Sequence, residues 1–442
     1  MNARTFLLWI SPLVIASAFI GIVVAKRESL AAAGERLYWN DSLFREVRGV
    51  VGRDYVEGIS EERSRRLFYA SVQAYLKGLD RYCHFYTPED YGELEQDTKG
   101  EFGGIGVMVR TEADGALLVT AAREGYPAWE AGIRPGDRIV EIGGVPTASL
   151  ETGELHKRLK GEVGTTVDVG VTRDGGTPVT RTLTRAVIRI ESVLGIRLVD
   201  DEHHVGYLRV NSFLENTVED FRRALERLKA DGAKAIILDL RQNDGGVLKT
   251  AVAMVDCFLA RGEIVIQRGR GETDLRVDRA NEEGTIFREE SLVVLVDARS
   301  ASASEIVAGA LQDHRRAVLV GERTYGKFLV QTLVSLPVGE GRAAVKLTTA
   351  KYLTPFGRFL QRDDEKGVRG GLLPEVNVPL SDEALASLRV RWEREAAPGW
   401  HRMDGADDEE EADDVADVQL AAAIDLLRGV AVVERIADGS GR

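Results

Sequence analysis

The most regular hydrophobic pattern in the chain lies in its second half, where short apolar runs alternate with segments of helical spacing. The runs predict strands, and the spacing between them predicts amphipathic helices. The expected strands are 205–210, 235–240, 292–296 and 317–320, and the expected helices are 218–230, 247–259 and 304–312. Strands that alternate with helices in this way are typical of α/β layers built on a largely parallel sheet.

A different pattern occupies residues 102–187, where short runs rich in Val, Ile and Thr are separated by turns that contain Gly and Asp. These runs predict a small β-rich unit with one amphipathic helix near residues 150–160. Its expected strands are 106–110, 117–120, 138–142, 166–172 and 179–184. Helical spacing precedes this unit at residues 37–79, and two more helices are expected at 385–394 and 419–428.

The amino end carries an apolar run at residues 6–25, with Arg4 before it and Lys26 and Arg27 after it. A helix of this length spans about 30 Å, the thickness of the hydrocarbon core of a bilayer. We therefore predict a membrane anchor, and a signal peptide cleaved near the small residues 31–33 is the alternative. Both interpretations place the rest of the chain in the periplasm or at another extracytoplasmic face.

Composition excludes several function classes. The 442 residues suffice for several domains, and a net charge of −13 without a concentrated basic face does not suit a nucleic-acid binder. Cys83 and Cys257 lie in apolar contexts and are predicted to be buried thiols. His203 and His204 are adjacent and point to opposite faces in an extended segment, so they do not predict a shared metal. No metal and no cofactor are expected.

Two turns that follow expected strands are candidates for chemistry, at residues 239–246 and 297–305. Each leads into a helix, whose free N–H groups suit an oxyanion. A serine in the second turn needs a base, and Lys327 is the candidate, because burial among apolar neighbours such as Phe328 favours a neutral amine. Each residue also has an ordinary structural interpretation, the serines as helix caps and Lys327 as a solvated surface charge.

Several motifs closely resemble those of the C-terminal processing (tail-specific) serine peptidases. They are Ser300–Ile306, Ala308–Asp313, Gly321–Glu322, Gly326–Lys327 with Gln331, Leu79–Asp80 with Tyr86–Glu89, and Leu240–Asn243 with Gly245–Gly246. The resemblance extends over roughly residues 35–380 and implies a crotonase-like α/β protease core with a Ser–Lys mechanism.

The resemblance also assigns roles to individual residues. In that family the nucleophile lies 25 residues before the lysine, which selects Ser302 as nucleophile and Lys327 as its base. By the same resemblance Gln331 positions the lysine, and the backbone N–H groups of Gly246 and Ala303 are the oxyanion donors. The serine attacks a peptide carbonyl, the lysine passes the proton to the leaving amine, and water resolves the acyl-enzyme.

Two positions depart from the family pattern. Phe328 stands where the family commonly has Gly after the lysine, and Asp244 stands where Pro is common before the paired glycines. Neither change removes a catalytic atom. Phe328 is expected to alter the local backbone or to narrow the pocket for the residue before the scissile bond.

The segments 100–107 and 131–139 look like parts of a PDZ domain. Glycines in the first segment let N–H groups converge on a terminal carboxylate, and the strand after them accepts an extended peptide by β-augmentation. The predicted peptide-binding residues are Phe102, Gly103, Gly104, Ile105, Gly106, Leu155 and Leu159. Family analogy adds that Arg158 or Lys160 links peptide capture to activation.

Together these observations predict a multidomain α/β protein. Its expected divisions are an anchor or signal segment (1–30), a helical domain (31–95), a PDZ domain (96–187), an α/β protease core (188–380) and a helical segment with an acidic loop (381–442). The expected activity is that of an exported serine endopeptidase that recognises nonpolar C-terminal tails of proteins or peptides and cleaves nearby. Activation by an adaptor or a lipoprotein, and a homodimer formed through the terminal helices, stay open at this point. The alternative functions are an inactive PDZ scaffold that binds protein C-termini and a different acyl hydrolase on the crotonase-like fold.

Overall fold

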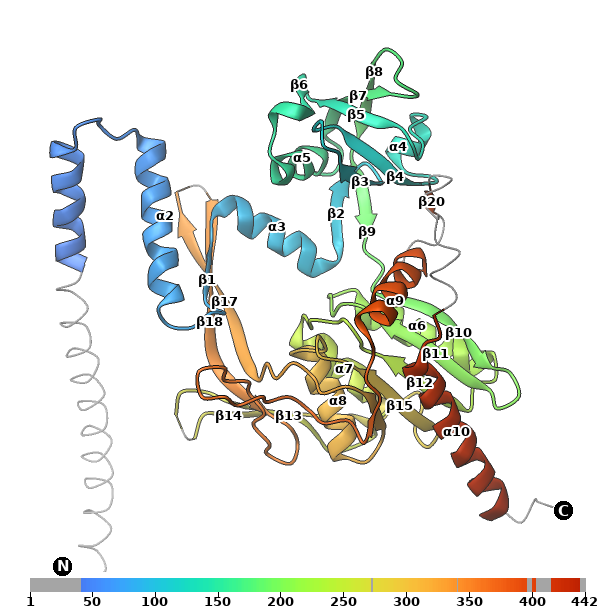
Figure 1. The fold of residues 1–442 in the computed structure, drawn as a ribbon. Helices are drawn as coiled ribbons and strands as arrows, with labels where there is room; N and C mark the ends of the chain where they lie inside the picture. The colour runs from blue at the N-terminus through green and yellow to red at the C-terminus, as the bar shows by residue number, and fades with distance from the viewer. Residues whose placement is uncertain (1–40, 272, 340, 396–399, 403–414, 438–442) are drawn as a thin grey trace, which may run out of the picture. The chain divides into compact units, whose positions relative to one another are not determined.

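The computed structural model describes residues 41–271, 273–339, 341–395, 400–402 and 415–437 (Figure 1). Its contacts divide the chain into two units, Met1–Gly78 and Leu79–Arg442. The predicted anchor or signal segment at residues 6–25 lies outside the described residues. Within the described part of the chain, no helix has both the length and the hydropathy that crossing a bilayer requires.

The described part of the first unit is helical, as its spacing predicts. A helix over residues 41–54 is followed by α2 (Glu61–Lys77). The Ser60 side chain caps α2 by accepting the N–H of Arg63 at 3.2 Å. Gly78 ends the helix.

The centre of the second unit is a six-stranded sheet. Its strands, in spatial order, are β10 (Val193–Asp200), β11 (Val205–Val210), β12 (Ala235–Asp239), β15 (Ser291–Val296), β16 (Val318–Gly321) and β19 (Val376–Asn377). Neighbouring strands run parallel except for β10 and β11. The predicted largely parallel sheet is therefore confirmed, with one antiparallel edge strand that the sequence pattern did not indicate.

Helices cover both faces of this sheet. The helices α6 (Thr217–Ala230), α7 (Leu248–Asp256) and α8 (Ala303–Asp313) pack on one face, and α10 (Val418–Ala437) packs on the other. Successive residues of a strand alternate between the two cores, as Leu208 and Tyr207 do on β11. Strands buried on both faces read as continuous apolar runs, which is why the sequence reveals them clearly.

A second sheet has five strands, one of which begins shortly after Lys327 in the sequence. It contains β1 (His84–Tyr86), β13 (Glu263–Arg268), β14 (Leu275–Arg279), β17 (Leu329–Val338) and β18 (Gly341–Leu353). The hairpin of β17 and β18 is antiparallel, and β1 pairs with β18 in the register His84 to Lys346. This pairing places the loop at residues 79–83 beside β18, where the Cys83 thiol accepts the Thr348 N–H at 3.5 Å.

The β-rich unit contains a seven-stranded sheet with two short helices. Its strands are β3 (Val107–Thr111), β4 (Leu117–Arg123), β5 (Arg138–Ile142), β6 (Val145–Pro146), β7 (Thr166–Thr172), β8 (Val179–Thr184) and β20 (Trp400–Arg402), and its helices are α4 (Pro127–Glu130) and α5 (Thr152–Leu159). The five predicted strands are confirmed. The ribbon of β2 (Glu101–Gly104) and β9 (Ala186–Arg189) leads into and out of it. The remaining elements are α3 (Pro88–Lys99), η1 (Thr147–Ser149), η2 (Glu282–Gly284) and α9 (Asp382–Glu395).

Candidate active site

Ser302 lies in the turn between β15 and α8, directly before the first residue of the helix. Its φ of 57° and ψ of −112° fall in a region that residues with a side chain rarely adopt, at a cost of roughly 1–3 kcal/mol. The turn is held by the Ser300 hydroxyl, which donates to the Leu240 carbonyl at 2.8 Å and accepts the Asp297 N–H at 2.9 Å. Ser302 is thus fixed, half-buried, at the carboxyl end of a parallel strand.

Lys327 lies in the loop between β16 and β17, and one buried carboxylate joins this loop to the Ser302 turn. Glu305 Oε2 accepts the backbone N–H groups of Ser302 at 2.9 Å and of Lys327 at 2.8 Å. Glu305 Oε1 accepts the Gly326 N–H at 2.7 Å and the Thr324 hydroxyl at 2.6 Å. Burial raises the pKa of Glu305, and these hydrogen bonds oppose the shift. A single side chain therefore sets the spacing of the two predicted catalytic residues.

The Lys327 side chain is half-buried, and this burial lowers the pKa of its amine below the ordinary lysine value. The charge of Lys346 on β18 lowers the pKa further, whereas Glu305 and Asp244 raise it. A lowered pKa increases the fraction of neutral amine, which is the form that accepts a proton. Nζ lies 5.2 Å from the centroid of the Tyr82 ring. Among the residues that the structure describes, no hydrogen bond joins this amine to the Ser302 hydroxyl.

The turn at residues 239–246 is tied directly to the Ser302 turn. The Asn243 carbonyl accepts the Ala301 N–H at 3.0 Å and the Ser304 hydroxyl at 2.9 Å. The Asn243 side chain in turn donates to the Val210 carbonyl at 2.7 Å. Ser304, predicted to be a turn or cap residue, thus joins the two loops.

The predicted oxyanion donors belong to the two turns that this junction connects. A Cβ at Gly245 would lie 2.8 Å from the Cβ of Ser302, so a side chain there would prevent the close approach. Gly246 follows with a φ of 147°, which strongly favours glycine. Ala303 is the first residue of α8, where backbone N–H groups have no partner within the helix. The two loops that carry the predicted donors therefore meet beside Ser302.

The residues after Lys327 differ in part from expectation. The Phe328 side chain is fully buried in the core and stacks on Tyr352, with ring centroids 4.6 Å apart. A fully buried side chain presents no surface to a substrate, so the expected narrowing of a substrate pocket by Phe328 was wrong. Gln331 lies on β17 and donates to the Thr348 hydroxyl at 3.4 Å rather than to Lys327. Its positioning role stays a prediction.

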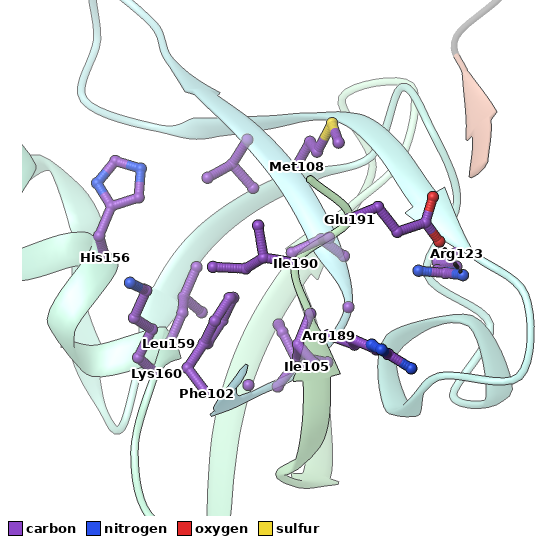
Figure 2. A pocket seen from close by; sticks show the side chains of 15 residues that line it. Phe102, Ile105, Met108, Arg123, His156, Leu159, Lys160, Arg189, Ile190 and Glu191 are labelled. Atoms are coloured by element: carbon purple, nitrogen blue, oxygen red, sulfur yellow. Dashed lines mark hydrogen bonds and ion pairs between the residues drawn. The ribbon is translucent and has the colours of Figure 1, made fainter. Parts of the chain in front are cut away.

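A cavity of about 360 Å³ lies between β3 and α5 in the β-rich unit (Figure 2). Of the predicted peptide-binding residues, Phe102, Gly104, Ile105, Gly106 and Leu159 line it. Leu155 does not, because its side chain packs in the core of the β-rich unit. Gly103 packs instead against Gly161, whose carbonyl would lie 2.0 Å from a Cβ at Gly103.

The cavity also includes residues that the sequence did not reveal. The segment 188–191, which comprises the end of β9 and the two residues after it, forms part of its wall. Arg123 on β4 donates to Glu191 in this segment at 2.8 Å (Figure 2). Lys160 lines the cavity, with Nζ 4.5 Å from the centroid of the Phe102 ring. Arg158 lies outside it and pairs with Glu154 at 2.8 Å. Of the two basic residues linked to peptide capture by analogy, Lys160 is thus the one at the groove.

Comparison with known proteins identifies the predicted protease core and the β-rich unit. Residues 204–378 match peptidase family S41, and residues 118–173 match the PDZ domain. A carboxy-terminal-processing protease of Bartonella bacilliformis is 35% identical over 379 residues, which cover 83% of this chain and 83% of that protein. The chain belongs to peptidase family S41.

A second relative agrees with this assignment, and one solved structure is also similar to the chain. A carboxyl-terminal-processing protease of Synechocystis sp. is 35% identical over 373 residues, covering 83% of this chain and 78% of that protein. The solved structure of a photosystem II D1 C-terminal processing protease is 29% identical, with a TM-score of 0.42, and the match covers 71% of this chain and 82% of that chain. The two relatives show that this S41 peptidase is a carboxyl-terminal processing serine protease, and the PDZ match shows its second domain.

Three residues at the centre of the candidate site received no role from the sequence. Glu305 stands within a quoted motif, but its contact with the Lys327 loop is visible only in the fold. The Tyr352 hydroxyl lies between the carbonyls of Lys327 and of Ser302, the latter at 3.0 Å, and its one proton serves a single acceptor at a time. Tyr82 reaches the site because β1 pairs with β18. No local sequence signal encodes any of these three contacts.

Proposed function

We propose that this S41 peptidase cleaves exported proteins near nonpolar C-terminal tails, with Ser302 as nucleophile and Lys327 as general base. The observation that supports this proposal most strongly is the Glu305 carboxylate, which accepts backbone N–H groups from both residues. The Ser302 turn and the Lys327 loop are thereby held together. The lowered pKa of Lys327, caused chiefly by burial, suits an amine that has to take a proton near neutral pH.

In the proposed reaction, Ser302 Oγ attacks the scissile carbonyl while its proton passes to Lys327 Nζ. The negative charge that develops on the carbonyl oxygen is stabilised by the backbone N–H groups of Gly246 and Ala303. Lys327 then gives the proton to the leaving amine as the C–N bond breaks, and water hydrolyses the acyl-enzyme. Lys327 has to approach the Ser302 hydroxyl for the first step, so we propose that substrate engagement brings the two groups together.

The PDZ groove is the proposed reader of the substrate tail. Its lining of Phe102, Ile105 and Leu159 is apolar, which suits an apolar last side chain, and the glycines at 104 and 106 leave room for a terminal carboxylate. Lys160 also lines the groove and pairs with Asp97 at 3.4 Å, and its positive charge favours a carboxylate. The groove wall formed by residues 188–191 leads directly into the core, and we propose it as the route by which an occupied groove affects the catalytic loops.

Two matched reporter proteins test substrate choice and mechanism together. They share one folded body and one unstructured tail, and end either in two apolar residues or in two aspartates. We expect the full chain to cleave the first reporter faster, and both Ser302→Ala and Lys327→Ala to abolish cleavage. Ser335→Ala and Lys351→Ala on the β17–β18 hairpin are matched controls that retain activity. Equal cleavage by the parent and by either catalytic-residue variant would refute the mechanism.

We further propose that residues 6–25 anchor the chain in the plasma membrane and that the peptidase acts on its outer side. The support is the apolar run with flanking basic residues. Protease added to intact spheroplasts should digest the catalytic part, and membrane fractions should hold the full-length chain. A protected catalytic part would contradict export, and a shortened soluble chain would favour cleavage of a signal.

A further inference from the structure

The Lys327 amine faces the ring of Tyr82, which comes from the loop between the helical unit and β1. Nζ lies 5.2 Å from the ring centroid, within the range of about 6 Å over which a cation and an aromatic face attract each other. Both residues are half-buried, and partial removal of water strengthens this attraction. Tyr82 is therefore in contact with the atom that the proposed mechanism charges and discharges.

The Tyr82 ring is held in place by contacts on both sides of the residue. Asp80 Oδ1 accepts the N–H of Tyr82 at 2.7 Å and of Cys83 at 2.9 Å, which closes the turn. The Cys83 thiol accepts the Thr348 N–H at 3.5 Å on β18, and Arg81 donates to the Tyr82 hydroxyl at 2.9 Å. The Arg81 guanidinium also lies 5.0 Å from the ring centroid, so the ring is positioned, with one cation beside it, before charge develops on Lys327.

Three other charged groups act on the Lys327 amine. Lys346 on β18 disfavours its ammonium form, while Glu305 on α8 and Asp244 in the turn before α7 favour it. Neither carboxylate forms a hydrogen bond with Nζ among the residues that the structure describes. Glu305 accepts hydrogen bonds from the N–H groups of Ser302 and Lys327, and Asp244 forms an ion pair with Arg299 at 2.8 Å. Neither of these two carboxylates takes the place of the third member of a Ser–His–Asp triad.

Proton transfer creates a positive charge on Lys327. When Ser302 Oγ bonds to the peptide carbonyl carbon, its O–H bond breaks and the proton joins Nζ, so the neutral amine becomes an ammonium. The charge persists until the proton moves to the leaving nitrogen. We propose that Tyr82 is a further catalytic residue of this peptidase, whose ring face stabilises the ammonium that Lys327 becomes during acylation. This inference rests on the proposed Ser302–Lys327 function.

The proposal predicts two opposite effects from removal of the ring. In the free enzyme the ring also favours the ammonium, so its loss lowers the pKa of Lys327 and moves the acid limb of kcat/KM to lower pH. In the transition state the same loss withdraws stabilisation, so the plateau of kcat falls. A purely structural defect would reduce activity without moving the acid limb in this direction.

The test compares Tyr82→Leu with Tyr82→Phe in the full chain, using the apolar-tailed reporter over a range of pH. We expect Tyr82→Phe, which keeps the ring face, to stay within about threefold of the parent at the plateau. We expect Tyr82→Leu to lose roughly fivefold to thirtyfold in plateau kcat, with its acid limb at lower pH. An unchanged plateau, or a lower plateau with an unmoved acid limb, would overturn the proposal.

A second measurement covers the case in which Tyr82→Leu fails to fold. Phenylalanine carrying one, two or three ring fluorines at position 82 keeps the ring size while it weakens the negative ring face stepwise. Plateau kcat should fall stepwise with fluorination, and a flat series would overturn the proposal. Lys327→Ala, assayed in parallel, separates the two claims. If it retains activity the proposed function fails, whereas inactive Lys327→Ala with parent-like Tyr82→Leu refutes only the role of Tyr82.

Discussion

Replacing Glu305 with glutamine removes one charge and hardly changes size, yet it should disable the peptidase. The carboxylate accepts hydrogen bonds from the N–H groups of Ser302, Gly326 and Lys327 and from the Thr324 hydroxyl. Glutamine retains one acceptor oxygen, which serves two of these donors. Its NH₂ group then faces the other two donors and can only donate. Two buried donors therefore lose their acceptor.

The size of the effect follows from the number of bonds lost. Hydrogen bonds to a charged group contribute roughly 1.5–3 kcal/mol each, so loss of two costs about 3–6 kcal/mol. Part of this lost free energy lowers the stability of the whole fold. The rest weakens the arrangement that holds the Ser302 turn against the Lys327 loop. If even 3 kcal/mol falls on the catalytic arrangement, kcat decreases by roughly 100-fold. KM should change much less, because the groove that we propose binds the tail is built from other residues.

The assay is steady-state cleavage of the apolar-tailed reporter, combined with urea unfolding of the same preparations. Glu375→Gln is the matched control, because Glu375 also accepts a backbone N–H, from Leu319 at 2.8 Å, but does not contact the catalytic loops. We expect this control to lose stability and keep kcat. A folded Glu305→Gln variant with more than half of the parental kcat would refute the claim that this carboxylate sets the active arrangement.

Three further predictions follow from charge and burial. Lys346→Gln removes a like charge that lowers the pKa of Lys327, so the acid limb of the pH–kcat/KM profile should move to higher pH, and an unmoved limb would contradict this electrostatic link. Burial raises the pKa of Cys257 to about 12, so iodoacetamide at pH 8 should label this thiol only after unfolding, which peptide mass spectrometry measures. The Arg428 guanidinium lowers the pKa of Asp200 to about 2, so this pair stabilises the fold above about pH 4 and loses its effect as the pH falls toward 2. In urea unfolding, Arg428→Ala should therefore have a lower free energy of unfolding than the parent at pH 7, and this difference should shrink in acid. A difference that does not change with pH would argue against the ion pair.

The parts of the fold that the sequence revealed are those with strong local signals. Strands such as 235–239 are buried on both faces and read as continuous apolar runs, and α6 shows a clear apolar stripe. The β17–β18 hairpin was missed because its half-exposed residues give no comparable run, and its pairing is decided by register with β1 and β13. The helix α10 continues beyond the expected end at Arg428, because the single Gly429 does not stop it.

The candidate site likewise contains residues that the sequence revealed and residues that it did not. Ser302 and Lys327 were identified through the resemblance to the motifs of a known family, and the fold brings their loops together. The Glu305 bridge, the Tyr352 hydroxyl and the Tyr82 ring depend on contacts between residues far apart in sequence, which no local pattern encodes. Phe328 was misjudged for the same reason, since its burial against Tyr352 depends on where β18 lies.

The most direct test of the central claim is to locate the covalent adduct formed with a fluorophosphonate that traps an activated serine. The parent should carry one adduct, mapped by mass spectrometry to Ser302, and labelling should increase as the pH rises through the pKa of Lys327. Lys327→Ala should label far more slowly. An adduct on Ser300 or Ser304, or labelling that does not depend on Lys327, would contradict the account.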